Sequence, residues 1–188
     1  MRLTSIWAVM LNNRAKKDSQ LVLNSLNIHP GAVIADIGSG GGYFTFELAK
    51  RTGAGGKVFA VDTNISLLKT IEKATKKKRV NNIETVIGHE DDCPLQKESC
   101  DLVFMRNVFH HIKNPVSYFK KLREAIRTEG RIAIIDWDST ARGYVGCAGH
   151  TTPETKIQQI MQEAGFEPVN SYRFLKGQSF NVFTKRIN

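Results

Sequence analysis

The segment that decides the fold is VIADIGSGGG, residues 33–42, in which an apolar run reaches an acid and four glycines then fall within five positions. A buried strand followed by a glycine-rich turn is typical of α/β proteins that bind a ligand beyond the carboxyl end of that strand. Gly38, Gly40 and Gly42 permit positive φ and a close approach of the ligand to the main chain. The following helix is expected to direct free N–H groups at the ligand.

Strands and helices alternate along the rest of the chain, which is typical of a parallel sheet covered by helices. The sequence predicts strands at residues 32–37, 57–62, 81–88, 101–106 and 130–137. Helices are predicted at residues 43–52, from Ile65 after a cap by Asn64, from Pro115, and at residues 152–165. No helix separates the last two strand candidates, residues 166–174 and 178–184, so we expect them to form an antiparallel hairpin.

Length and composition predict one domain, because 188 residues suffice for a single core and no repeat is visible. Cys93, Cys100 and Cys147 are odd in number and lack C-x-x-C spacing, so the sequence predicts neither disulfides nor a metal site. The apolar stretch near the start is shorter than a membrane span and no signal-peptide cleavage site follows it. We therefore expect a cytoplasmic protein without a membrane span.

Two familiar nucleotide-binding motifs do not fit the glycine segment. A dinucleotide fingerprint that begins at Gly38 and Gly40 requires a third glycine where this chain has Tyr43. A phosphate P-loop requires G-K-[S/T] after its second glycine, which neither this segment nor GAGGKV supplies. The remaining pattern is D-x-G-x-G-x-G.

This pattern resembles motif I of the class I S-adenosylmethionine-dependent methyltransferases. Residues 87–115, IGHEDDCPLQKESCDLVFMRNVFHHIKNP, are similar to the segment from the adenine loop through the fourth strand in UbiE-like and type 11 members. The resemblance covers roughly residues 20–185. It implies an α/β, Rossmann-like seven-stranded sheet, mostly parallel with one antiparallel edge strand and with helices on both faces. Residues 1–30 would be an N-terminal helical cover and residues 31–188 the cofactor-binding core of one domain, 1–188.

The resemblance also implies a cofactor, S-adenosylmethionine, with S-adenosylhomocysteine as the product. Asp62 matches the acid that accepts from the ribose hydroxyls, although it is also placed to cap the next helix. Many relatives have an acid directly after the third-strand glycine, but here His89 follows Gly88, so Asp92 is favoured for the adenine and Asp91 is second. Arg106 is a candidate for the methionine carboxylate or a charge at the rim. The predicted cofactor-binding residues are Asp36, Gly38, Ser39, Gly40, Gly42, Asp62, Thr63, Asp91, Asp92, Arg106 and Asn107.

The implied reaction is an in-line displacement at a sulfonium methyl group, for which positioning supplies most of the acceleration. A base is needed only when the acceptor arrives protonated, so the catalytic residue is left unknown. Four side chains are candidates for the acceptor pocket, with a purely structural role as the alternative for each histidine: His150, Tyr144, His110 and His111. Cys147 invites a comparison with arsenite chemistry, but the paired cysteines of arsenic methyltransferases are absent.

The acceptor is predicted to be a small molecule, because little chain is inserted around the strand ends. The formal net charge of +9 raises the alternative of an RNA- or protein-directed methyltransferase, or of a cofactor-binding module with weak activity. The main basic cluster, residues 73–79, falls where a helix should end, and cations are favoured there by the helix dipole. Nucleic acid is therefore not the favoured partner, and the sequence does not predict the oligomeric state.

Overall fold

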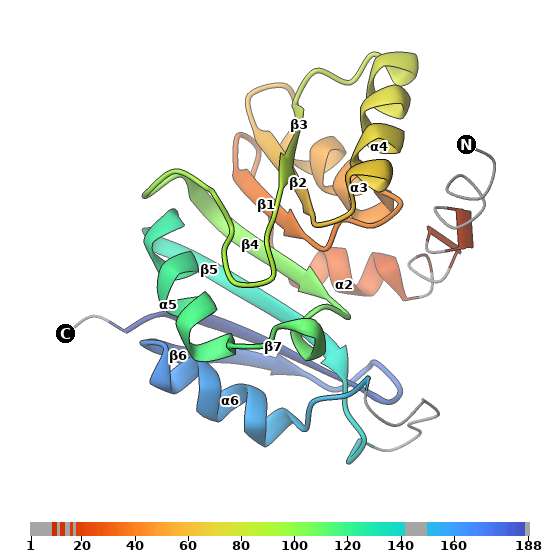
Figure 1. Cartoon of the computed structure of the whole chain (residues 1–188). Coiled ribbons are helices and arrows are strands. Elements are labelled where there is room, and N and C mark those ends of the chain that lie inside the picture. Colours follow the sequence, from red (N-terminus) through yellow and green to blue (C-terminus); the bar gives the residue numbers. More distant parts are fainter. Residues whose placement is uncertain (1–8, 11, 14–15, 17, 142–149, 187–188) are drawn as a thin grey trace. The chain divides into compact units, whose positions relative to one another are not determined.

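The computed structural model describes residues 9–10, 12–13, 16, 18–141 and 150–186. Contacts divide the chain into two compact units, residues 1–89 (unit 1) and residues 90–188 (unit 2). In each unit strands alternate with helices (Figure 1). The helix α2 (Ser19–Ser25) lies within the predicted N-terminal cover. The single domain of residues 1–188 stays a prediction.

Unit 1 contains a parallel sheet of β1 (Val33–Ile37), β2 (Lys57–Asp62) and β3 (Ile83–Ile87), with β2 in the middle. The helix α3 (Tyr43–Thr52) connects β1 to β2, and α4 (Ile65–Lys78) connects β2 to β3. These elements confirm the predicted strands and helices of this half. Most side chains of β1 and β2 are buried, which explains why both strands appear in the sequence as nearly continuous apolar runs.

The helices α3 and α4 begin and end where the sequence predicted. Gly53, with φ 68°, terminates α3. The side chain of Asn64 caps α4, accepting hydrogen bonds from the N–H groups of Ser66 at 3.0 Å and Leu67 at 3.4 Å. The last turn of α4 carries the basic residues 76–78, where the helix dipole favours cations.

Individual side chains of α4 approach α3 and the residue before it. The ammonium group of Lys78 in α4 lies 4.6 Å from the ring centroid of Phe46 in α3. A Cβ at Gly42, directly before α3, would lie 2.9 Å from Cγ1 of Ile71 in α4. Packing therefore requires a glycine at position 42, in addition to its φ of 83°.

Unit 2 contains four strands. β4 (Cys100–Arg106) and β5 (Ile126–Trp137) are parallel, while β6 (Phe166–Tyr172) and β7 (Gln178–Lys185) form the predicted antiparallel hairpin. β7 lies between β5 and β6 and is antiparallel to both. β7 is therefore the reversed strand and β6 is the edge, which agrees with burial, since β7 is mostly buried and β6 mostly exposed.

The strand order is β3-β2-β1-β4-β5-β7-β6 in one seven-stranded sheet. This order confirms the predicted α/β fold, a mostly parallel Rossmann-like sheet. Three helical elements connect the strands of unit 2: η1, a 3-10 helix (Phe109–His111), α5 (Pro115–Ala125) and α6 (Glu154–Glu163). The helices α5 and α6 contact each other, so they lie on one face of their strands.

β5 begins at Ile126, four residues earlier than the sequence indicated, and Gly130 lies inside the strand. The register between β4 and β5 shifts between Cys100 and Leu102. A Cβ at Gly130 would lie 2.6 Å from Cγ2 of Ile126 and 2.9 Å from the Cys100 carbonyl oxygen. Because Gly130 has no side chain, the backbones of β4 and β5 can approach closely at this irregularity. Gly130 therefore lies inside β5 and does not mark its start.

No helix within the described part of the chain is long and apolar enough to cross a bilayer.

We predict that Asn82→Ala lowers the free energy of unfolding by about 1–2 kcal/mol. The Asn82 amide nitrogen donates to the carbonyl oxygens of Ala49 at 2.8 Å and Gly53 at 2.9 Å, and so holds the end of α3. Chemical denaturation measures the effect. The matched control is Asn81→Ala at the exposed neighbouring position, and equal losses in the two variants would contradict this role for Asn82.

Candidate functional site

The loop between β1 and α3 directs most of its main-chain donors into the protein. The N–H groups of Gly38 and Ser39 both donate to the Val61 carbonyl oxygen, at 2.8 Å and 3.0 Å, and the Gly42 N–H donates to the Ser39 carbonyl at 2.8 Å. Gly38 and Gly40 have φ of 73° and 54°. This left-handed backbone lets the loop turn back toward β2.

Asp62, at the end of β2, joins two loops of unit 1. One carboxylate oxygen accepts from the Gly40 N–H at 2.8 Å, and the other accepts from the Asn64 N–H, also at 2.8 Å. Asn64 caps α4, so Asp62 does not have the alternative role of helix cap and instead holds the N–H of the capping residue. Each carboxylate oxygen that accepts from a backbone N–H keeps a second lone pair for a ligand hydroxyl. Thr63 follows and is exposed.

Asp36, the acid of the glycine motif, is 3% exposed. The Thr45 hydroxyl donates to its carboxylate at 2.6 Å, and the backbone N–H of Thr45 donates to it as well. Burial, with a smaller contribution from the Asp62 carboxylate, raises the pKa of Asp36 to about 7 despite these two hydrogen bonds. Unit 1 thus has two neighbouring acids beside its glycine loop.

The first turn of α3 differs from the prediction that it offers free N–H groups to a ligand. The Tyr43 N–H donates to Oδ1 of Asn12 at 3.0 Å, and the Asn12 amide donates in turn to the Gly41 carbonyl at 3.0 Å. The Thr45 N–H is held by Asp36. The prediction is wrong for Tyr43 and Thr45, because side chains distant in the sequence satisfy these donors.

Ser39 in the glycine loop has a buried hydroxyl group. Its Oγ is buried and has no hydrogen-bond partner among the described residues. A buried hydroxyl without a partner costs free energy, so such a group in a binding loop points to a ligand.

In unit 2, Arg106 and Asn107 follow the carboxyl end of β4. Arg106 donates to Oε1 of Gln178 at 3.2 Å, and the Gln178 amide donates to Oδ1 of Asn107. Asn107 has φ 60°, a left-handed conformation that asparagine tolerates, and its N–H donates to the Ile135 carbonyl at 2.8 Å. Gln178 at the start of β7 therefore forms a hydrogen bond with each of these two predicted residues.

The two predicted adenine acids differ in exposure. Asp91 is exposed, and its carbonyl oxygen accepts from the Lys121 ammonium at 3.3 Å. Asp92 is half-buried, and its carboxylate accepts from the N–H of Cys93 at 2.9 Å. The carboxylate of Asp92 is thus held in place by the backbone.

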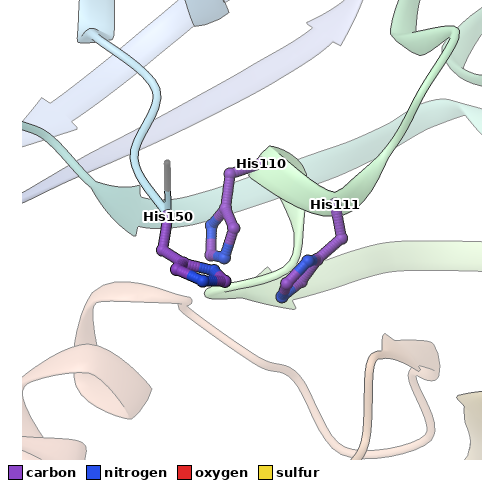
Figure 2. Close-up of side chains that lie close together, drawn as sticks. All are labelled: His110, His111 and His150. Carbon is purple, nitrogen blue, oxygen red and sulfur yellow. The ribbon is translucent and has the colours of Figure 1, made fainter. Parts of the chain in front are cut away.

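Three of the four pocket candidates meet in unit 2. Figure 2 shows the rings of His110, His111 and His150 pointing toward one another. One ring nitrogen from each lies within 4.8 Å of the others. His110 and His111 come from η1, whereas His150 lies in the segment that leads into α6. The fourth candidate, Tyr144, lies outside the described residues, as does Cys147.

A buried acid orients the first of these histidines. Nδ1 of His110 lies 2.7 Å from Oδ1 of Asp136, and the backbone N–H of His110 donates to the other carboxylate oxygen at 2.8 Å. An ionised carboxylate only accepts, so the ring donates from Nδ1 in this hydrogen bond and its Nε2 is directed away from Asp136. Burial and the neighbouring imidazoles of His110 and His150 lower the pKa of His111.

A separate hollow of about 730 Å³ lies in unit 1 and includes Lys50, Lys57 and Arg79 in its lining. Lys57 is the first residue of β2, so this hollow lies at the amino end of the strands. Open α/β sheets bind ligands at the carboxyl ends of their strands. The hollow is therefore not the candidate site.

The model of the family described as "Methyltransferase domain" matches residues 28–165, which is well over half of the chain. The chain belongs to this methyltransferase domain family.

Solved and curated proteins agree with the family. A crystal structure of a SAM-dependent methyltransferase from Aquifex aeolicus has a TM-score of 0.84 at 23% identity and covers 96% of this chain and 97% of that one. An arsenite methyltransferase of Halobacterium salinarum is 27% identical over 150 residues, 74% of this chain and 38% of the relative. A demethylmenaquinone methyltransferase of Lactococcus lactis is 29% identical over 109 residues, 56% of this chain and 42% of the relative.

This methyltransferase domain spans about two fifths of the length of these two curated relatives. At 23% identity, the likeness to the Aquifex aeolicus structure establishes the class I fold.

Sequence reasoning missed Asn12, Asp136 and Gln178 in this methyltransferase domain. A sequence signal existed for Asp136, because it is an acid at the end of an otherwise apolar strand, as Asp36 and Asp62 are. Asn12 and Gln178 had no such signal. They are polar residues of ordinary sequence context that the fold brings to Tyr43 and Asn107.

We predict that the free energy of unfolding of the wild type falls relative to that of Asp36→Asn as the pH rises from about 4 to about 7. A carboxyl whose folded pKa is raised contributes stability that is fully present below its unfolded pKa and is lost as the pH rises through its folded pKa. A shift from 3.8 to about 7 corresponds to an upper limit of about 4 kcal/mol.

Denaturation curves at several pH values measure this difference. The variant also loses part of the hydrogen bonding to Thr45, so its absolute stability differs from that of the wild type. The quantity to compare is therefore the slope of the free energy of unfolding against pH. Parallel stability curves for the two proteins would contradict a raised pKa at Asp36.

Proposed function

We propose that this protein is an S-adenosylmethionine-dependent methyltransferase that transfers the methyl group to a small-molecule acceptor by in-line displacement. The proposal rests on the family and on the chemistry of the glycine loop.

The proposal rests chiefly on where the main-chain N–H groups of the glycine loop donate their hydrogen bonds. A loop that binds phosphate needs unsatisfied N–H groups aimed at the anion. Here the N–H groups of Gly38, Ser39, Gly40 and Gly42 all bond within the protein. The loop region therefore offers carbonyl and carboxylate oxygens, which suit a ligand with a cationic ammonium and sulfonium and ribose hydroxyls better than a pyrophosphate.

The residues of unit 1 fit this cofactor. The buried hydroxyl of Ser39 lacks a partner in the described part of the protein and is available to a ligand. The Asp62 carboxylate is held by two N–H groups and keeps lone pairs for the ribose hydroxyls. Asp36 adds a second acidic group beside the loop, which favours a cation. When bound, the cofactor supplies an electrophilic methyl group on a good leaving group.

The resemblance also assigns cofactor contacts to residues of unit 2. Of the two adenine candidates we favour Asp92, because the Cys93 N–H orients its carboxylate while the carboxylate of Asp91 is exposed. Arg106 is proposed to contact the methionine carboxylate, with Gln178 and Asn107 restricting its position. In unit 1, Thr63 is proposed to lie beside the ribose.

A small organic acceptor is favoured over arsenite, which binds to thiolates. Burial raises the pKa of Cys93 to about 12 and also raises the pKa of Cys100, so both thiols stay protonated. The curated relatives include both an arsenite and a demethylmenaquinone methyltransferase. Among the cysteines that the structure describes, the buried Cys93 and Cys100 support an organic acceptor.

An RNA- or protein-directed activity, or a cofactor-binding module of weak activity, remains the second candidate because of the net charge of +9. The principal basic cluster lies in the last turn of α4, where the helix dipole accounts for it. One of its members, Lys78, packs over Phe46. These contacts support a structural role for the cluster. We further propose a single domain of residues 1–188 and a cytoplasmic location, the latter because three cysteines without disulfide spacing suit a reducing compartment.

We predict that the protein binds S-adenosylmethionine and S-adenosylhomocysteine and does not bind NAD, as measured by calorimetry. Gly40→Val should abolish the binding of both adenosyl ligands, because a β-branched residue is strained at φ 54° and the loop has to change. Asp62→Asn should weaken binding by about tenfold or more, since hydrogen bonds to a charged acceptor contribute about 1.5–3 kcal/mol.

The matched glycine control is Gly55→Ala. A Cβ there has only the Gly31 Cα nearby, at 3.9 Å, so the variant should bind like the wild type. Circular dichroism of each variant separates loss of binding from loss of folding. Binding of NAD instead of the adenosyl ligands would overturn the proposal.

We also predict that binding to RNA is weak and nonspecific. Affinity for a structured RNA, measured between 50 and 200 mM salt, should show a shallow dependence, since few phosphates are neutralised. A tight complex with a steep salt dependence would favour the polymer-directed alternative.

A further inference from the structure

The strongest unassigned feature of the molecule is the cluster of three imidazoles in unit 2. We infer that His110, His111 and His150 bind one divalent first-row transition-metal ion of the Zn²⁺ class. Imidazole nitrogen is a preferred ligand of Zn²⁺, Fe²⁺, Co²⁺ and Ni²⁺ and a poor one for Mg²⁺ or Ca²⁺. The inference is independent of the proposed methyl transfer.

The distances fit such a site after small side-chain rotations. Zn–N bonds of about 2.0–2.1 Å in a tetrahedron place two ligand nitrogens about 3.3 Å apart. One nitrogen from each of the three rings already lies within 4.8 Å of the others. His111 and His150 are exposed, so their rings can rotate toward a common ion without disturbing the core.

Asp136 supplies the outer partner that metal-binding histidines usually have. A histidine ligand commonly donates its second ring N–H to a carboxylate, which sets the tautomer and raises the basicity of the ligating nitrogen. Here Nδ1 of His110 lies 2.7 Å from Oδ1 of the fully buried Asp136. The backbone N–H groups of His110 and Trp137 also donate to this carboxylate, at 2.8 Å and 2.9 Å. His110 is therefore oriented with Nε2 available.

The backbone on both sides of the cluster is tied to the carboxyl end of β5. The Thr152 N–H, two residues after His150, donates to the Trp137 carbonyl at 2.9 Å. Asp138 accepts from the Glu154 N–H at 3.3 Å at the start of α6. On the other side, Asp136 holds the backbone of His110. These bonds reduce the ordering that metal binding has to impose on the protein.

Three protein ligands leave a fourth tetrahedral position for water or for a donor atom of a bound small molecule. Sites with three protein ligands are typical of catalytic zinc, whereas structural zinc sites have four. The cluster also lies after the carboxyl ends of β4 and β5, the edge at which α/β sheets bind ligands.

The test is calorimetry with Zn²⁺ on protein first stripped with a chelator, followed by visible absorption of the Co²⁺ form. We expect one ion per chain and a Co²⁺ spectrum typical of a tetrahedral nitrogen and oxygen set. His111→Ala and His150→Ala should each weaken Zn²⁺ binding at least tenfold. Both side chains are exposed, so these variants should fold, which circular dichroism checks.

His29→Ala is the matched control, because His29 is an exposed histidine of unit 1 that lies outside the cluster. It should bind Zn²⁺ like the wild type. Asp136→Asn should weaken binding by about 10–100-fold through His110. Equal Zn²⁺ affinity in the wild type and in both cluster variants, or a thiolate-to-cobalt charge-transfer band in the Co²⁺ spectrum, would overturn the three-histidine site.

Discussion

The hydrogen bonds of the Asp62 carboxylate are the interaction on which the proposed cofactor site depends. One oxygen holds the N–H of Gly40 in the loop after β1, and the other holds the N–H of Asn64 at the start of α4. A single side chain thus sets the spacing of the two loops that follow β1 and β2. Because the same carboxylate is the candidate for the ribose hydroxyls, positioning of the loops and ligand binding are combined in one residue.

In unit 2, an acid at the end of β5 likewise accepts hydrogen bonds from the segments that follow. The buried Asp136 holds the backbone and the ring of His110, and Asp138 holds the first turn of α6. Asp36, at the end of β1, similarly binds Thr45 in α3. Acids at the carboxyl ends of parallel strands therefore satisfy the main-chain donors of the turns that follow.

The sequence predicted most strands and helices of this methyltransferase domain closely, because each carried its own local signal. The apolar runs of β1 and β2, the cap by Asn64 and the glycine that ends α3 all act within a few residues. It misjudged the start of β5, since Gly130 looked like a turn and in fact allows a close backbone approach within a strand irregularity. It also misjudged the first turn of α3, whose donors are taken by Asn12 and Asp36.

Local chemistry alone determined the glycine loop, the acids Asp36 and Asp62 and the alternation of strands and helices. Those features depend on φ preferences, hydrophobic period and capping, which short segments of chain carry. Only the tertiary structure decided that His150 joins His110 and His111, since residues 40 positions apart meet through the β5 and α6 backbone. It also decided that the loop donors turn inward, because the carbonyl of Val61 and the carboxylate of Asp62 reach them only once β1 and β2 pair.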